Sequence, residues 1–487
     1  MLIIRFLIVA AAVAMPTMQA RGEMLGRVSS ESQSFQLQEG FLGAIMPSSP
    51  TFNEQYGSPA PGGGMMGLSA SMTKDVYIIP SITLSGTYDN NVYNAPKTPG
   101  LKREDYITTL APQLQVQRLG SLVKLNFGIG ATASHYAVNQ GLSYVGSNAT
   151  TTLNVTQLAR QWIPNIKSLQ VTDSFSFSPI PPSFLTGDTQ VSQALDTSGT
   201  PSVADQYTRG LQAFRVNTYT NMAGINGVYP VTSLVDFRGS YTYSIIKFGT
   251  PFVAGSGGDF LNSTNHNISA GPTMQITTRD AISLSGVFQQ TDYGQNGYHS
   301  FGGTLGWSSQ LGSQLRSNIM AGATSTQTQS TNGTVAAAQS DVNYIGGASL
   351  IYTRGATVAS LNYSAGVFPS YFVQTGPLLS NVVSVTVWHR ATSQLSFSVS
   401  ANYSHNAPLN SSSGSVPTGT SLAFQSVSGS AGISYLINKN LAMSLSETFG
   451  WFKGAGQGAF GAAGGGGIGD EFTRNAITIS LTTFGLY

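Results

Sequence analysis

The sequence predicts an all-β fold: a transmembrane antiparallel β-barrel of about 18 strands, with short periplasmic turns and longer extracellular loops. Three observations predict it. Apolar residues alternate with uncharged polar ones along much of the chain, short and long connections alternate, and charge is scarce. Only 9% of the 487 residues are charged, against about 25% in ordinary globular domains. A soluble surface of this size would carry more charge, so one face of the strands is expected to meet lipid.

The alternation is clearest in QLSFSVSANYSH, residues 394–405. The odd positions from Leu395 to Tyr403 are apolar, and the even positions from Ser396 to Ser404 are serine or asparagine. A period of two places these sets on opposite faces of a strand. The same alternation recurs in 123–132, 235–245, 268–276 and 477–482. We therefore expect an apolar face toward lipid and a polar face toward a wet interior.

The connections set the order of the strands. Walking from turn to turn, we expect strands near 76–89, 105–117, 121–137, 142–159, 166–179, 214–229, 233–248, 262–278, 280–293, 298–310, 313–328, 341–353, 356–371, 379–389, 393–406, 421–436, 439–453 and 471–487. The least distinct boundaries lie at 139–141, 294–297 and 180–216, so the count is 16 or 18. An even number is usual for bacterial outer-membrane barrels.

Strand length and backbone pairing favour a closed barrel over other β folds. A soluble sandwich would expose a charged face, and a propeller would show a repeat of about 40–50 residues. The expected strands are also longer than the usual five or six residues, whereas about 9–11 tilted residues cross a bilayer. A sheet in lipid must close on itself because an open edge leaves backbone groups unpaired.

The N-terminus predicts export. Residues 1–20 read MLIIRFLIVAAAVAMPTMQA, with one early arginine, a short apolar core and a small residue for cleavage, as in a Sec-type signal peptide. A membrane anchor is the alternative. Residues 21–73 are rich in Gly, Pro and Ser without periodicity, which predicts a mostly disordered periplasmic extension. Residues 74–487 form the expected barrel, in the outer membrane of a Gram-negative bacterium.

The C-terminal residues and the absence of cysteine are consistent with an outer-membrane location. The chain has no cysteine, which excludes a disulfide scaffold and a lipoprotein anchor. Its last residues, Phe484 to Tyr487, resemble the aromatic C-terminal signal that the barrel-assembly machinery reads. The expected partners are therefore outer-membrane lipid and that machinery, and the sequence does not fix an oligomeric state.

A barrel of 16–18 strands leaves room for an aqueous channel. Most inward positions are Ser, Thr, Asn, Gln or Gly, a lining that suits neutral, hydroxyl-rich solutes. The candidate lumen charges are Lys124, Asp236, Arg238 and Arg316. Asp236 and Arg238 lie on one face, as a local pair or as part of a constriction.

Asp173 and Glu447 fall on the lipid-facing parity of their strands. Charged side chains on that face are unfavourable near the bilayer midplane. Either the alternation shifts by one residue there, or these carboxylates lie near the rim of the barrel.

Other motifs do not point to chemistry. GQGAFG at 456–461 and GGGGIG at 464–469 match G-x-G-x-x-G, but no strand-helix-strand unit surrounds them, so we interpret them as a loop. Five scattered histidines lack metal-ligand spacing, and no nucleophile and base stand out. We expect no enzyme, cofactor or metal. A net charge of +2 gives no electrostatic case for nucleic acid.

The first expected hairpin carries a family resemblance. Residues Tyr88 to Tyr93 read YDNNVY, and Asp105 precedes a strand containing TTLAP. This pattern, clearest over 76–137, resembles a family of β-barrel porins of Gram-negative outer membranes that is often associated with exopolysaccharide gene clusters. The resemblance implies an outer-membrane channel, with a polysaccharide or a small polar solute as cargo.

Three functions follow as hypotheses. The first is a porin-like channel for passive passage of polar, neutral or carbohydrate-like solutes. The second is an outer-membrane component of exopolysaccharide export that meets periplasmic partners through 21–73. The third is a structural or adhesive surface barrel whose long loops bind a ligand. An energised receptor is disfavoured because residues 21–73 are too few for a folded plug domain.

Overall fold

The computed structural model describes nine segments of the chain, which belong to one compact unit. They are residues 76–93, 102–178, 216–251, 262–293, 296–330, 340–368, 378–409, 423–454 and 471–485. The expected signal peptide at 1–20, the extension at 21–73 and the Gly-rich motifs at 456–461 and 464–469 lie outside the described residues.

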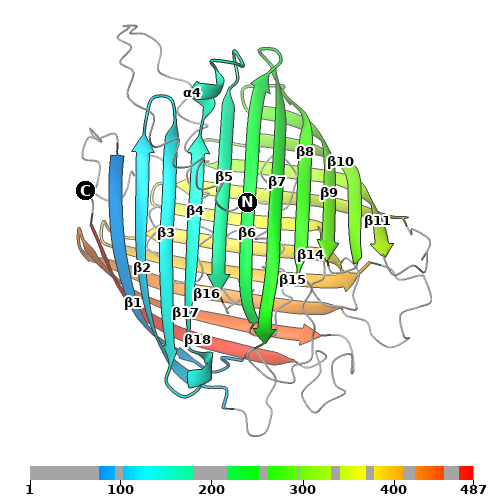
Figure 1. Ribbon diagram of the computed structural model, residues 1–487. Helices are drawn as coiled ribbons and strands as arrows, with labels where there is room; N and C mark the ends of the chain where they lie inside the picture. The colour runs from blue at the N-terminus through cyan, green and yellow to red at the C-terminus, as the bar shows by residue number, and fades with distance from the viewer. Residues whose placement is uncertain are drawn as a thin grey trace. The chain divides into compact units, whose positions relative to one another are not determined.

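Eighteen strands account for nearly all of these segments (Figure 1). The first nine are β1 (Val76–Asp89), β2 (Asp105–Leu119), β3 (Lys124–Tyr136), β4 (Tyr144–Asn154), β5 (Ser168–Ser178), β6 (Val216–Pro230), β7 (Val235–Pro251), β8 (Ser263–Gln275) and β9 (Asp280–Tyr293). The others are β10 (Asn296–Gln310), β11 (Leu315–Ser330), β12 (Ser340–Arg354), β13 (Thr357–Phe368), β14 (Leu378–Arg390), β15 (Leu395–Pro408), β16 (Phe424–Asn438), β17 (Leu441–Gly454) and β18 (Phe472–Phe484). The expected strands are confirmed, and the count is 18 rather than 16.

The sheet is a closed ring. Each strand pairs antiparallel with its neighbour in the chain, and β1 also pairs with β18, from Ser81 opposite Phe484 to Asp89 opposite Ala476. Figure 1 shows the first and last strands side by side along one edge of the view. Closure leaves no strand edge with unpaired N–H and C=O groups, which is the condition for a sheet to cross lipid.

The two ends of the barrel have different connections. At the turn side, the end that carries α4 in Figure 1, most strands are joined by a few residues, such as 231–234 between β6 and β7. At the loop side the connections include the longest ones, such as the one from Ser178 to Val216. Two loop-side joints are short: η2 (Gln140–Leu142) lies between β3 and β4, and β9 and β10 are separated by two residues, 294–295.

Most expected bounds differ from the observed ones by one to three residues, and one is wrong by more. The strand expected over 142–159 ends at Asn154, and a short helix, α4 (Thr156–Ala159), follows it. The Asn154 side-chain oxygen accepts a hydrogen bond from the Thr156 amide at 3.2 Å, a local contact that competes with continued strand pairing. Among the described residues, no helix has the length and hydropathy needed to cross a membrane.

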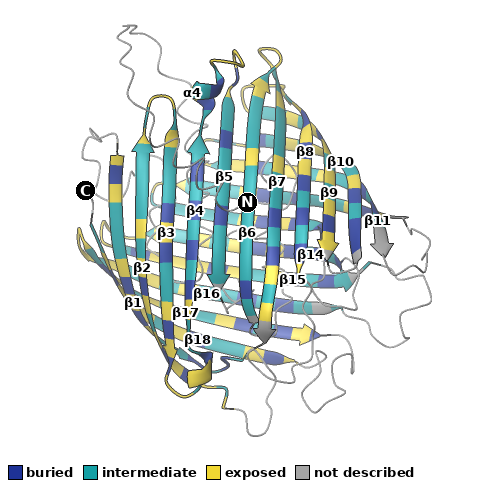
Figure 2. Cartoon of the chain, viewed as in Figure 1, coloured by how far each residue is buried: buried dark blue, intermediate teal, exposed yellow. Residues whose placement is uncertain are grey.

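Burial is inverted relative to a soluble protein. The buried described residues are mainly Ser, Thr and Asn, whereas Leu, Ile, Val, Phe and Tyr side chains are exposed on nearly every strand. In β15, Val399 is 54% exposed and Ser404 only 1% exposed. Figure 2 shows this alternation of buried and exposed residues along the strands. So extensive an apolar surface is incompatible with water and suits lipid contact.

Glycines mark a close approach of strands in the β8–β11 part of the barrel. A Cβ on Gly302 would overlap the carbonyl oxygen of Ala323, and one on Gly322 would overlap that of Gly303. On Gly271 it would overlap the carbonyl oxygen of Leu284. Gly271, Gly302 and Gly322 share the inward parity with buried Ser and Thr residues. Only glycine fits such a tight inner bend, where neighbouring backbones converge.

Candidate functional site: the barrel lumen and its closing seam

The inner face is a lattice of paired hydroxyl groups. Hydroxyl oxygens of neighbouring strands lie 2.6–2.9 Å apart at Thr83–Thr482, Ser240–Ser269, Ser400–Ser430, Ser404–Ser426 and Ser444–Ser480. Each hydroxyl has one donor and two acceptor positions, so pairing with a neighbour leaves hydrogen-bonding capacity. A ring of such groups presents a polar, uncharged wall to whatever lies inside the barrel.

The four sequence-predicted lumen charges share one end of the barrel. Lys124 begins β3, Asp236 and Arg238 lie near the start of β7, and Arg316 is the second residue of β11. Each shares its parity with buried polar residues of its own strand: Ser134 in β3, Ser244 in β7, and Thr324 and Thr326 in β11. Each side chain therefore starts from the inner wall at the turn side.

Two further cations lie on or beside the inner wall at this end and were missed by sequence reasoning. The Lys167 Nζ lies 2.6 Å from the Asp236 Oδ1, with the two side chains 50% and 21% exposed. Arg390 ends β14 on the inward parity, opposite the buried Ser396. Lys167 falls on the outward parity of the strand expected over 166–179, but the structure places it just before β5. Arg390 falls in a segment expected to be a turn. The Asp236 carboxylate thus has an ion-pair partner outside its own strand.

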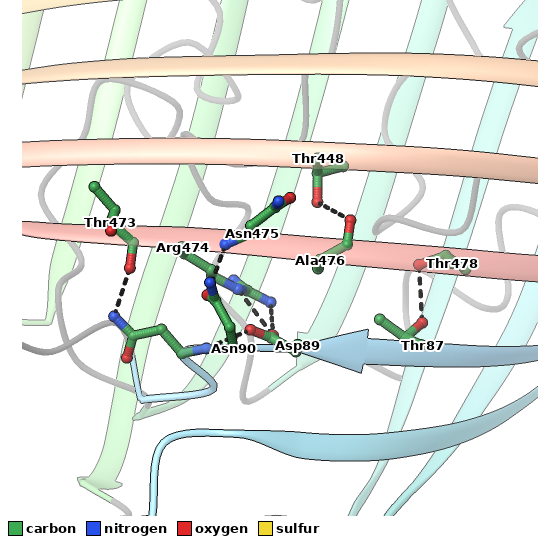
Figure 3. Close-up of polar contacts among 10 residues, drawn as sticks. Thr87, Asp89, Asn90, Thr448, Thr473, Arg474, Asn475, Ala476 and Thr478 are labelled. Carbon is green, nitrogen blue, oxygen red and sulfur yellow. Dashed lines mark hydrogen bonds and ion pairs between the residues drawn. The ribbon is translucent and has the colours of Figure 1, made fainter.

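The seam between β1 and β18 holds a buried ion pair at the loop side (Figure 3). Arg474 donates from Nε to the Asp89 Oδ2 at 2.9 Å, and its Nη2 lies 2.5 Å from the same oxygen. The Asp89 side chain is fully buried and that of Arg474 is 18% exposed. The other Asp89 oxygen accepts the Asn91 amide at 2.9 Å, so both carboxylate oxygens are satisfied.

Asn90 and Asn91 continue the seam beyond this ion pair. The Asn475 amide donates to the Asn90 Oδ1 at 2.8 Å, and the Asn90 amide donates to the Asn475 carbonyl at 3.1 Å (Figure 3). The Asn91 side chain donates to the Thr473 carbonyl at 2.9 Å. The DNN triplet quoted for the family resemblance therefore joins the first strand to the last.

Asp105 anchors the adjoining loop-side joint. Its Oδ1 accepts the amides of Tyr106 and Val138 at 2.8 and 2.9 Å, and its Oδ2 accepts the Asn139 amide at 2.7 Å. Val92 of the same joint packs in a cluster with Ile107, Tyr136 and Leu142. Asp105 thus fixes backbone rather than facing a solute.

The outward carboxylates Asp173 and Glu447 keep their lipid-facing parity. The pairing of β5 and β17 is continuous through both residues, and neither lies at a strand end. Each carboxylate accepts a hydrogen bond from an asparagine on the next strand: Asn221 to Asp173 at 2.9 Å, and Asn475 to Glu447 at 3.0 Å. A local amide partner, rather than a parity shift or a rim position, accompanies each carboxylate.

Metal chemistry has no site in the described part of the chain, where no three His, Asp or Glu side chains gather as ligands. The lumen wall, the turn-side charges and the seam are therefore the features from which a function can be argued.

Comparisons with known proteins add little to this geometry. No protein-family model matches the chain, and no curated protein matches it. OprD of Pseudomonas aeruginosa shares 10% identity with a TM-score of 0.39, covering 84% of this chain and 95% of that one. OccAB3 of Acinetobacter baumannii shares 10% with a TM-score of 0.39, covering 85% and 100%. OccK9 (OpdG) of Pseudomonas aeruginosa shares 9% with a TM-score of 0.40, covering 84% and 99%.

At such scores these likenesses carry no argument, so the classification rests on strand pairing and burial. A closed ring of 18 antiparallel strands, apolar outside and polar inside, defines a transmembrane β-barrel.

Proposed function

We propose that this protein is an outer-membrane channel through which polar, neutral or carbohydrate-like solutes pass passively. The observation that supports it most is the inner face, which 18 strands line mainly with Ser, Thr and Asn side chains. Barrels of this strand number are wide enough for an aqueous channel. A wall without charge through its middle suits solutes that carry hydroxyl groups.

Passage requires only that a solute exchange hydrogen bonds with water for hydrogen bonds with the wall. The half-buried hydroxyls of Ser240, Ser430 and Ser444 retain acceptor positions for this exchange. Because such bonds are nearly balanced against those with water, a solute binds weakly and moves on. Transport then follows the concentration gradient.

The four turn-side charges belong to this proposal as lumen residues. Lys124, Asp236, Arg238 and Arg316 surround the turn-side mouth, where an entering or leaving solute would meet them. The Lys167–Asp236 pair is partly exposed, and such pairs contribute little to stability, typically about 0–1 kcal/mol.

We further propose that residues 1–20 direct export as a signal peptide and that 21–73 remain in the periplasm. The aromatic C-terminal residues would be read by the barrel-assembly machinery, which would insert residues 74–487 into the outer membrane. Membrane fractionation of the full chain with and without residues 1–20 tests the localisation, because the shortened chain should stay in the cytoplasm.

The exopolysaccharide connection rests on the resemblance over 76–137. In this chain the motif residues Asp89, Asn90 and Asn91 contact β18, so they support a role in barrel closure rather than in binding a cargo. Export of polysaccharide and a structural or adhesive role remain the alternatives. Deleting the gene should then abolish the extracellular matrix or surface adhesion while small-solute permeability stays unchanged.

Conductance of the purified full-length protein in a planar bilayer tests the proposed function. We expect discrete current steps in KCl, and added neutral sugars that enter the lumen should reduce the conductance in a size-dependent way. A protein that inserts, resists proteolysis in the bilayer and yet carries no current would contradict the proposal.

A further inference from the structure

The inner wall at the turn side is rich in cations. Four strands contribute one cation each on the inward parity: Lys124, Arg238, Arg316 and Arg390. A fifth, Lys167, lies at the same end in the connection before β5 and reaches Asp236 at 2.6 Å. These residues, which we call the mouth cations, come from β3, the α4–β5 connection, β7, β11 and β14.

Acidic residues do not balance the mouth cations in the described part of the chain. Asp236 is the one acidic side chain there that combines the inward parity with a turn-side position. Asp280 also lies at the turn side, but it has the outward parity of β9, shared with the exposed Leu284. The described inner wall at this end therefore carries a net positive charge.

Charge elsewhere on the inner wall is local. At the loop side, Asp89 is paired with Arg474, and Asp105 accepts bonds from backbone amides. Between the two ends, the described inward positions are uncharged. The lumen thus has a longitudinal asymmetry, with its positive charge concentrated at the turn-side mouth.

The mouth cations attract anions strongly because the wall and the surrounding lipid have a low dielectric constant. A mouth lined by one sign of charge focuses the field and raises the local concentration of counter-ions. The Debye length of about 8 Å at physiological ionic strength limits this effect to the mouth itself. Guanidinium groups such as those of Arg316 and Arg390 also pair with carboxylates through two parallel hydrogen bonds.

We propose that the mouth cations make the channel select anionic over cationic solutes, with small carboxylates such as carboxylated sugars as the favoured class. This inference rests on the proposed passive channel and adds the charge of its preferred solutes. The mouth cations would first attract the carboxylate group of such a solute. The neutral middle of the lumen would then form hydrogen bonds with the hydroxyl groups of the solute as it passes.

The reversal potential of the full-length protein in a planar bilayer tests this proposal. Under a tenfold KCl gradient, we expect chloride to be several-fold more permeant than potassium. A gradient of potassium glucuronate should give a reversal potential of the same sign. The double variant R316Q/R390Q should bring both ratios at least about twofold closer to one.

A matched control separates the mouth from bulk charge. Arg118 and Arg354 also lie at the turn side, but on the outward parity of β2 and β12, so R118Q/R354Q removes the same charge from the outer face. Its permeability ratios should equal those of the unmodified protein. Cation selectivity, equal permeability, or equal effects of the two double variants would overturn the inference while leaving the channel intact. Absence of any current would instead refute the proposed function, and this inference with it.

Discussion

At the residue scale, the strongest interactions are those of buried charged groups. Asp89 is fully buried at the seam, and its two carboxylate oxygens accept hydrogen bonds from Arg474 and the Asn91 amide. Removing one member of a buried ion pair leaves an uncompensated charge, which destabilises a protein by about 3–5 kcal/mol. This pair therefore contributes far more to the integrity of the barrel than the partly exposed Lys167–Asp236 pair.

Arg474→Gln is expected to lower the free energy of unfolding by about 3 kcal/mol, because it leaves the Asp89 carboxylate buried without a cation. Urea titration of the protein folded in phospholipid vesicles, followed by tryptophan fluorescence, measures this change. Lys167→Gln removes one cation from an exposed pair and should change the same quantity by less than about 1 kcal/mol. Equal effects of the two substitutions would show that the seam pair has no special role.

The lipid-facing Asp173 depends on Asn221 in a similar way. Asn221→Ala should destabilise the barrel by about 1–3 kcal/mol because the carboxylate loses its donor on an apolar face. In an Asp173→Ala background the same substitution should cost less, because the Asn221 bond to the Ser174 carbonyl at 3.0 Å is then lost without a bond to Asp173, and the difference gives the coupling energy of the pair. Additive effects in the four unfolding measurements would mean that the two side chains do not support each other.

At the element scale, alternation of side chains decides what forms. The strands could be predicted from the period-two pattern. Lipid contacts one face of the sheet and polar groups contact the other, so each residue type is favourable on one face only. The pattern could not show α4, because Thr156 to Ala159 form a single turn fixed by local backbone bonds. It also could not show that Asn221 lies within hydrogen-bonding distance of Asp173. That contact depends on the register of β5 and β6, which are joined by the 179–215 connection.

Gly302 tests the tight inner bend of β8–β11. Gly302→Ala should destabilise the barrel by about 1–3 kcal/mol, because the new Cβ would overlap the Ala323 carbonyl and force β10 and β11 apart. The midpoint of the heat-induced mobility shift in SDS gels reports the loss. Gly239→Ala is the control, since a Cβ there meets nothing within 4 Å. If both variants melt together, close backbone approach at Gly302 does not limit the packing of these strands.

At the scale of the whole molecule, the chain is a single sheet closed by contacts between its first and last strands. Asp89 and Arg474 lie 385 positions apart in sequence, so no local sequence pattern could predict their ion pair. The sequence indicated a closed barrel because lipid forbids a free edge, and it placed Lys124, Asp236, Arg238 and Arg316 on the polar parity. The pattern missed Lys167 because it falls on the outward parity of the strand expected over 166–179, and it missed Arg390 because that residue falls in an expected turn.

The absence of cysteine allows a direct test of the inverted barrel, since each engineered cysteine is unique in the chain. Single cysteines at Ser398 and Ser434, inward positions that are not buried, should react with a water-soluble, membrane-impermeant maleimide in vesicles. Those at Phe397, Val399 and Ala401 should react only with a lipid-soluble reagent, because their side chains face the bilayer. Equal labelling of both sets by the water-soluble reagent, or labelling of the odd set alone, would contradict a barrel that is wet inside and apolar outside.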